Sequence, residues 1–177
     1  MSTKHLLKAV IIAAALVTIP SFAAAQSSSG TLTVTATVES SIAMTFENDP
    51  AGVTLTGAST NAATMAIGTI SAYNTIATPN VTRTVSASDF TVSSLFGVKV
   101  VKANSSSSNY TLAAALGSAD STNTWRINST TLTTTPQNLG TTYSYNTAVA
   151  HTVYLTVPLT ASTGAISKVL NFTATAN

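Results

Sequence analysis

The chain contains no cysteine and very few charged residues. Its 177 residues include 7 Lys and Arg and 5 Asp and Glu, so only 7% are charged. The absence of cysteine excludes a disulfide-stapled domain and any Cys-ligated metal site. Glycine (8) and proline (5) are also scarce, which excludes a collagen-like chain, and the low charge is unlike that of a disordered chain. At this length we expect one domain with a single core.

Small hydroxyl residues are abundant instead. The sequence has 34 Thr and 23 Ser, together 57 of 177 residues. The branched side chain of Thr loses rotamer freedom in a helix and suits a strand. Since no window shows a sustained 3.6-residue repeat, the composition favours an all-β protein.

Residues 1–25 have the pattern of a signal peptide. Lys4 and Lys8 precede an apolar stretch, residues 9–19, and Ala23 and Ala25 stand at −3 and −1 before Gln26. The apolar stretch is shorter than the roughly 20 residues that cross a bilayer. We therefore expect cleavage after Ala25, export through Sec to the periplasm, cell surface or medium, and no transmembrane anchor.

Cleavage would change the net charge of the protein. Removing Lys4 and Lys8 leaves 7 − 2 = 5 basic residues against 5 acidic ones, a net charge of zero. A neutral mature chain gives no reason to expect a nucleic-acid partner. Weak charge repulsion between copies instead suits a protein that assembles with itself.

Within residues 26–177, apolar residues recur at every second position, the period of a half-buried strand. Such alternating rows are centred on Thr31–Val38, Ile42–Phe46, Val53–Leu55, Met65–Ile67, Phe96–Val100, Tyr110–Leu116, Trp125–Ile127, Val149–Val157 and Ile166–Ala176. The Asn104–Asn109 stretch between two of these rows predicts a hairpin. The fold class predicted for this single domain is an all-β, Ig-like antiparallel β-sandwich of about seven to nine strands.

A search for catalytic and metal-binding residues finds no convincing set. His151 is the one histidine after residue 25, so a multi-His metal site is excluded there, and we expect it to be a partly buried strand residue. No Gly-x-Ser-x-Gly elbow accompanies it. The five candidate acids are Glu39, Glu47, Asp49, Asp89 and Asp120. We interpret the densest cluster, at Glu47–Asp49, as a turn, and we predict no enzyme activity, no cofactor and no metal.

Two tyrosines offer a candidate ligand-binding site. Tyr143 and Tyr145 lie in a loop-like stretch with Asn138 and Asn146 nearby, and aromatic rings beside amides would suit a carbohydrate. Trp125 is expected in the core of the sandwich, and Arg126 on its opposite face. The alternative function is therefore a monomeric extracellular module that binds carbohydrate or a surface.

The N-terminal part of the expected mature chain has the features of a donor strand, at residues 30–38. A polar lead from Gln26 to Ser29 precedes a row of apolar residues at alternate positions: Leu32, Val34, Ala36 and Val38. A strand on such a lead can pair with its own sheet or with the open edge of a neighbour. The sequence leaves open whether it pairs in cis or in trans.

The C-terminal fourteen residues carry a resemblance to a known family. Gly164 is followed by an alternating row that includes Ile166, Leu170, Phe172 and Ala174. This arrangement resembles the C-terminal strand of chaperone–usher pilins and, more closely, of the spore coat protein U-like family of secreted subunits. The chain differs from the family pattern at Ala176, where the pattern has an aromatic residue, and in having no cysteine pair.

The resemblance implies a function and partners. Gly164 would be the turn glycine, and Leu170, Phe172 and Ala174 the inward row that a periplasmic chaperone holds until an usher assembles the subunit. Residues Leu32 to Val38 would then fill a groove of a second copy. The expected function is a secreted structural subunit of a surface fibre or coat that forms a homopolymer by β-strand addition without catalysis.

Overall fold

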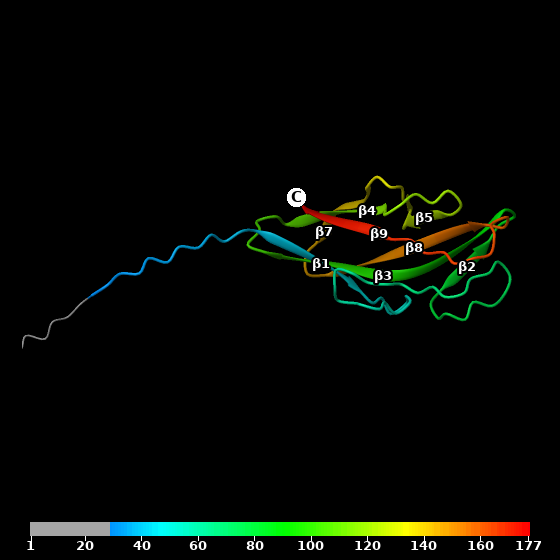
Figure 1. Ribbon diagram of the computed structural model, residues 1–177, viewed down its shortest axis with the longest axis horizontal. Helices are drawn as coiled ribbons and strands as arrows, with labels where there is room; N and C mark the ends of the chain where they lie inside the picture. The colour runs from blue at the N-terminus through cyan, green and yellow to red at the C-terminus, as the bar shows by residue number, and fades with distance from the viewer. Residues whose placement is uncertain (1–28) are drawn as a thin grey trace, which may run out of the picture. The chain divides into compact units, whose positions relative to one another are not determined.

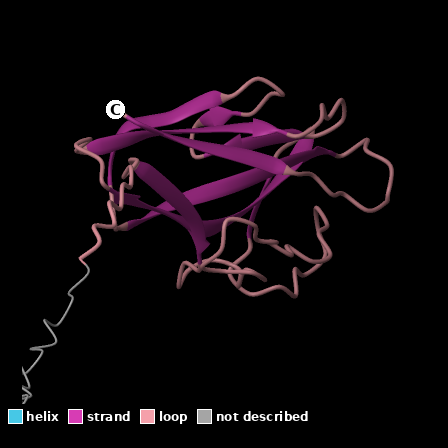
Figure 2. Cartoon of the chain, turned by 60° about the vertical axis from the view of Figure 1, so that its left-hand side comes forward, coloured by secondary structure: helices cyan, strands magenta, loops and turns pink. Residues whose placement is uncertain are grey.

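The structure, a computed structural model, describes residues 29–177, so the predicted signal peptide lies outside the described residues. Residues 29–36, taken by themselves, contain no regular secondary structure. Residues 37–177 contain nine strands in two antiparallel sheets (Figures 1 and 2), which confirms the predicted all-β sandwich. The described part of the chain holds no helix that is long and apolar enough to cross a membrane.

The larger sheet has six strands and the smaller has three. The larger sheet follows the order β1 (Ser41–Glu47), β3 (Asp89–Ala103), β8 (Ala148–Pro158), β5 (Thr124–Ile127) and β6 (Thr130–Thr131), with β2 (Thr82–Val85) paired to β3 beyond the end of β1. The smaller sheet follows the order β7 (Gln137–Ser144), β4 (Asn109–Leu116) and β9 (Leu170–Ala176).

The connection between β3 and β4 corrects the predicted hairpin. These consecutive strands do not pair with each other: β3 pairs with β1, β2 and β8, whereas β4 pairs with β7 and β9. The Asn104–Asn109 stretch therefore carries the chain from one sheet to the other. Each strand buries its own alternating row against the opposite sheet, a pattern that a hairpin and an inter-sheet connection share.

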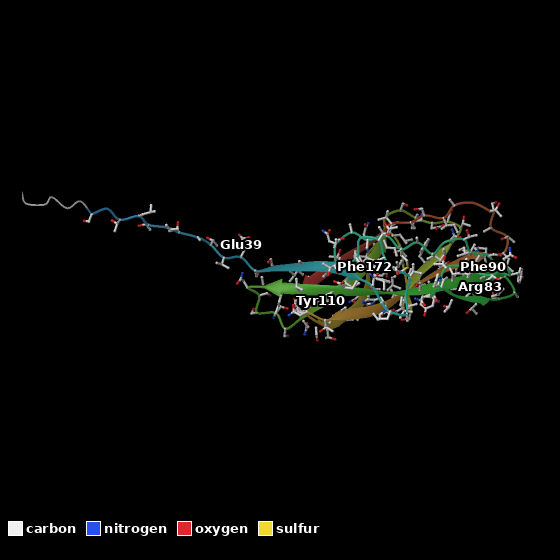
Figure 3. All side chains as sticks on the ribbon, turned by 90° about the horizontal axis from the view of Figure 1, so that it is seen from below. Glu39, Arg83, Phe90, Tyr110 and Phe172 are labelled. Carbon is white, nitrogen blue, oxygen red and sulfur yellow. The ribbon has the colours of Figure 1, made fainter. Side chains whose placement is uncertain are left out.

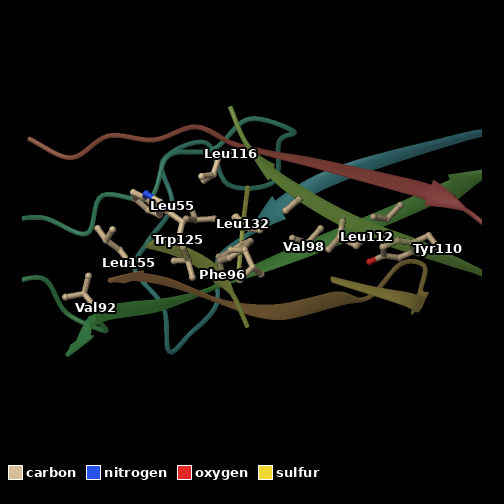
Figure 4. Packing of buried hydrophobic residues seen from close by; sticks show 14 of the residues in the cluster. Leu55, Val92, Phe96, Val98, Tyr110, Leu112, Leu116, Trp125, Leu132 and Leu155 are labelled. Atoms are coloured by element: carbon tan, nitrogen blue, oxygen red, sulfur yellow. The ribbon is translucent and has the colours of Figure 1, made fainter. Parts of the chain in front are cut away.

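The core lies between the sheets and contains most of the rows predicted to be buried. Val98, Val100 and Leu112 are fully buried, and Trp125 is 8% exposed, which confirms it as a core residue. Figure 4 shows the side chains of Val98, Leu112 and Trp125 packed between the strands. Trp125 also donates a 2.8 Å hydrogen bond from Nε1 to Asp120 Oδ2, so the ring is held in one orientation.

A long irregular segment, residues 48–81, takes the place of two predicted strands. The rows at Val53–Leu55 and Met65–Ile67 form no strand, although Val53 and Leu55 are buried at 7% exposure and contribute to the core. Ser94 of β3 anchors the segment, because its Oγ accepts a 2.9 Å hydrogen bond from Val53 N–H and donates one of 3.0 Å to the carbonyl of Asn80. Alternation here reflects burial on one side, which an ordered loop also achieves.

Candidate functional site

Two free strand edges lie on the same side of the sandwich, at β1 and β9. Among residues 37–177, β1 pairs with β3 and β9 pairs with β4, and each of the two edge strands is seven residues long. The Phe46 end of β1 is partly covered, because Phe46 and residues 59–60 exchange backbone hydrogen bonds of 2.8 and 2.6 Å. The rest of β1 and the outer edge of β9 are the candidate site.

The hydrogen-bond pattern of β9 fixes which backbone groups are free. Gly117 N–H donates to Val169 O at 2.8 Å, and Asn177 N–H donates to Asn109 O at 3.1 Å, so the odd-numbered residues of this stretch bond to β4. In an antiparallel ladder the alternate residues direct their N–H and C=O groups to the other edge. The residues that do so are Leu170, Phe172, Ala174 and Ala176.

The same β9 residues form an incompletely covered apolar row. Their partners on β4, from Leu116 to Tyr110, are at most 6% exposed, whereas Leu170, Phe172 and Ala174 are half-buried and Ala176 is exposed. The inward row of β1 behaves in the same way, because Ile42, Met44 and Phe46 are half-buried beside the buried row of β3. Burial therefore decreases towards this side of the sandwich on both sheets.

Three phenylalanines connect the two sheets at this side. The ring of Phe172 on β9 packs edge-on against Phe46 on β1, with centroids 5.2 Å apart, and against Phe96 on β3 at 5.7 Å. Figure 3 labels Phe172 on the side-chain view. Such edge-to-face contacts hold aromatic rings in defined positions, so Phe172 is a fixed and bulky residue next to the small Ala174.

The expected donor segment is irregular in this structure. Residues 29–40 contain no strand, so the pairing of the candidate donor strand at residues 30–38, in cis or in trans, stays a prediction. Leu32, Val34 and Val38 are 88%, 80% and 73% exposed, and Ala36 is exposed as well. An isolated strand without a partner is unstable in water, so the alternating row alone does not produce one.

The C-terminal assembly residues fall into two groups. Leu170, Phe172 and Ala174 lie on β9 with their side chains towards the core, as the resemblance implies. Ile166 and Gly164 precede β9 in irregular structure, which corrects the prediction of a single strand from Ile166 onwards. A Cβ at Gly164 would meet no atom within 4 Å, so the structure gives no steric reason for glycine there.

Tyr143 and Tyr145 do not form an exposed aromatic platform. Tyr145 is 8% exposed and Tyr143 is half-buried, and both rings pack on the buried ring of Tyr110, at 5.3 and 5.6 Å (Tyr110 is labelled in Figure 3). Tyr143 Oη donates to Leu139 O at 2.9 Å. The candidate ligand site at these two residues is corrected, because both rings belong to the packing of the smaller sheet.

The four carboxylates other than Glu39 each accept hydrogen bonds from nearby groups. Burial alone would raise the pKa of Asp120, but hydrogen bonds from the N–H groups of Asn123, Trp125 and Thr122 hold it well below its usual range. Hydroxyls of Thr45 and Ser59 lower the pKa of Glu47. The other two accept from Ala51 N–H, at Asp49, and from Ser88 Oγ, at Asp89.

The described residues offer no cluster that suits a metal ion. In residues 29–177 no three His, Asp or Glu side chains come close enough to hold one. Glu39 is exposed in the irregular stretch before β1. His151 is 1% exposed, more deeply buried than expected, and burial lowers the pKa of its imidazole.

Sequence reasoning did not single out Ile42, Met44 and Phe46 as site residues. They were predicted to form a strand, and they do, but their importance comes from the position of β1 at an open edge. No local signal in the sequence marks a strand as an edge strand, since pairing is decided by distant segments. Comparison with known proteins finds no matching family model, no matching curated protein and no matching solved structure.

Proposed function

We propose that this chain is an exported structural subunit that assembles with copies of itself by β-strand addition, without catalysis. The observation that carries the proposal is the coexistence of an exposed apolar row, residues 32–38, with a free strand edge of the same length whose own apolar row is only half-buried. A donor strand from a second copy would bury both rows and pair the free backbone groups of β9.

The side-chain sizes favour one register for the added strand. In an antiparallel arrangement, Leu32 and Val34 would lie opposite Ala176 and Ala174, and Ala36 would lie opposite Phe172. Val38 would then reach Leu170, so the seven-residue donor would cover all of β9. Leu32 and Val34 of the donor would thus lie beside small alanines, and the small Ala36 would lie beside the ring of Phe172. Close packing requires such pairing of large with small side chains, and only Val38 beside Leu170 departs from it.

Pairing of the donor segment with β1 of its own chain is disfavoured. Only Glu39 and Ser40 separate the donor row from β1, and a two-residue hairpin loop needs positive φ angles that Gly and Asn adopt most easily. Neither residue suits such a turn, so the segment is poorly placed to pair with the β1 of its own chain. The predicted signal peptide and the zero net charge of the remaining chain agree with export and self-association.

The experiment is to measure the mass distribution of the purified chain by light scattering, with paired charge substitutions. Val34→Asp places a carboxylate in the row that becomes buried, whereas Thr33→Asp places the same charge on the opposite face of the donor. We expect polymers from the unsubstituted chain and from Thr33→Asp, and monomers from Val34→Asp. A monomeric unsubstituted chain, or polymers from Val34→Asp, would overturn the proposal.

The register has its own test. Ala36→Phe should block polymer formation, because two phenylalanine rings would compete for one space, and Phe172→Ala in the same chain should restore it. Failure of this rescue while Val34→Asp still blocks assembly would reject the register and keep strand addition. The binding-module alternative loses its specific residues, since Tyr143 and Tyr145 are packed in the fold.

A further inference from the structure

His151 is buried in the middle of the sandwich, away from the free edge. It lies on β8 opposite Phe96 of β3 and is 1% exposed. Its ring packs against Phe96 at 5.9 Å and against Tyr143 of the smaller sheet at 5.6 Å. Its Nδ1 is 3.1 Å from Nδ2 of Asn128, and its Nε2 is buried without a hydrogen-bond partner. A titratable group is therefore enclosed between apolar rings and one amide.

Asn128 holds the turn between β5 and β6 against β8. Its backbone N–H donates to Thr152 O at 2.8 Å, and its Oδ1 accepts from Thr152 N–H at 2.9 Å. The side chain of Asn128 thus continues the β5–β8 pairing beyond its last pair, Ile127 with Val153. Its φ of 52° lies in the left-handed region, which Asn adopts more readily than most residues.

These bonds assign the proton of the imidazole. Because Oδ1 of Asn128 is occupied by Thr152 N–H, the Nδ2 amide group faces His151 as a donor. Nδ1 of His151 must therefore accept, which places the single proton of the neutral ring on Nε2. A second proton on Nδ1 would bring two donors together. Rotating the amide by half a turn would remove this clash, but it would place Nδ2 of Asn128, a donor, against the N–H of Thr152, which is also a donor.

The surroundings provide no charge that would stabilise an imidazolium. The sheets contribute Phe96 and the neutral phenols of Tyr143 and Tyr110, the latter packed behind Tyr143. Lys102 of β3 lies over Tyr145 instead. Strand alternation directs the remaining charged side chains of neighbouring strands to the outer face of the larger sheet: Glu47, Asp89, Lys99 and Arg126. Among residues 29–177 no carboxylate bonds to the ring.

We propose that His151 and Asn128 form an acid-sensitive lock, in which uptake of a second proton by His151 releases the β5–β6 turn from β8. Asn128 is itself exposed, so its side chain can leave and admit water to Nδ1 without unfolding of the core. The unfolded chain binds the proton at the ordinary His pKa of about 6.5, whereas burial depresses the pKa in the fold. The stability contribution is therefore complete above about pH 6.5 and is lost as the pH falls below it.

The test follows amide hydrogen exchange in the full chain at pH 7.5 and pH 5.0, corrected for the intrinsic effect of pH. We expect protection of the Thr152 amide to fall about tenfold or more at pH 5.0, since one pKa unit is a factor of ten. Protection of Val92, a fully buried residue of β3, serves as the internal reference. Equal protection of Thr152 at both pH values would overturn the proposal.

Two substitutions distinguish the lock from general acid sensitivity. Asn128→Asp keeps an acceptor for Thr152 N–H and offers a carboxylate to protonated Nδ1, so protection of Thr152 should hold or rise at pH 5.0. His151→Phe removes the titrating group and should abolish the pH dependence. If Asn128→Asp loses protection as much as the unsubstituted chain does, the lock is rejected, even where His151→Phe fails to fold.

Discussion

Replacing Asp120 with Ala should destabilise the domain, because this carboxylate organises the loop before β5. It accepts hydrogen bonds from Thr122 N–H at 3.1 Å, Asn123 N–H at 2.9 Å and Trp125 Nε1–H at 2.8 Å. The Asp120 side chain is 10% exposed and Trp125 is 8% exposed, so the bond between these two side chains is largely shielded from water. Lys168 Nζ lies 4.0 Å away and contributes little at that distance.

The size of the effect follows from the bonds that would be lost. A buried hydrogen bond to a charged group contributes about 1.5–3 kcal/mol, and the two turn bonds contribute about 0.5–1.5 kcal/mol each when water can replace them. We expect Asp120→Ala to lower the free energy of unfolding by about 3 kcal/mol. Asp120→Asn should cost about half as much. The Asn side-chain oxygen can still accept from the N–H groups of Thr122 and Asn123, but its NH₂ group would face the indole N–H of Trp125, and two donors cannot bond.

The assay is urea unfolding at pH 7, followed by fluorescence of the single tryptophan. Asp89→Asn is the matched control, because Asp89 accepts a side-chain bond from the neighbouring Ser88 at the surface, and its loss should cost less than about 0.5 kcal/mol. The low pKa of Asp120 gives a second readout: its contribution is present above about pH 3.9 and is lost as the pH falls below that value. A free energy of unfolding for Asp120→Ala within about 0.5 kcal/mol of the parent, which is the contribution of one weak hydrogen bond, would refute the reasoning.

Two further predictions each compare a pair of sites at which the structure implies different effects on stability. Tyr110→Phe removes a buried hydroxyl without a hydrogen-bond partner and should leave stability unchanged or slightly raised, whereas Tyr143→Phe removes the bond to Leu139 O and should cost about 1 kcal/mol in urea unfolding. A larger loss of stability for Tyr110→Phe than for Tyr143→Phe would contradict the hydrogen bonds assigned to the two hydroxyls. Gly52→Ala would place a Cβ 1.9 Å from the carbonyl oxygen of Leu95 and should lower stability by about 1–3 kcal/mol, while Gly164→Ala, with open space around it, should have no effect on the thermal midpoint. Equal midpoints for the two alanine variants would show that residues 48–81 adjust freely against β3.

The pattern of buried and exposed residues could be predicted from the sequence where strands are regular. Phe96, Val98 and Val100 are buried as their two-residue period indicated, and Lys99 between them lies on the outer face. The same period misled at Val53–Leu55, because a loop fixed by Ser94 buries those residues equally well. Periodicity reports which side of the backbone is covered, and it does not report whether the backbone is paired.

The candidate site could be predicted only in part. The C-terminal row Leu170, Phe172 and Ala174 was expected to face inward, and it does. Tyr143 and Tyr145 were expected at the surface because polar residues surround them in sequence, yet both pack on Tyr110 from the next strand of the smaller sheet. Burial of a side chain depends on which distant strand lies beside it, and the neighbouring residues in the sequence do not indicate which strand that is.

The sequence by itself determined that this protein is a β-sandwich, because the alternation of side chains across a strand is a property of each short segment. Tertiary structure alone decided that β3 and β4 belong to different sheets, that β1 and β9 end up as free edges on one side, and that His151 lies under Asn128. Those outcomes depend on pairing between segments far apart in the chain. Many pairings satisfy the same alternating pattern, and packing of the whole core selects among them.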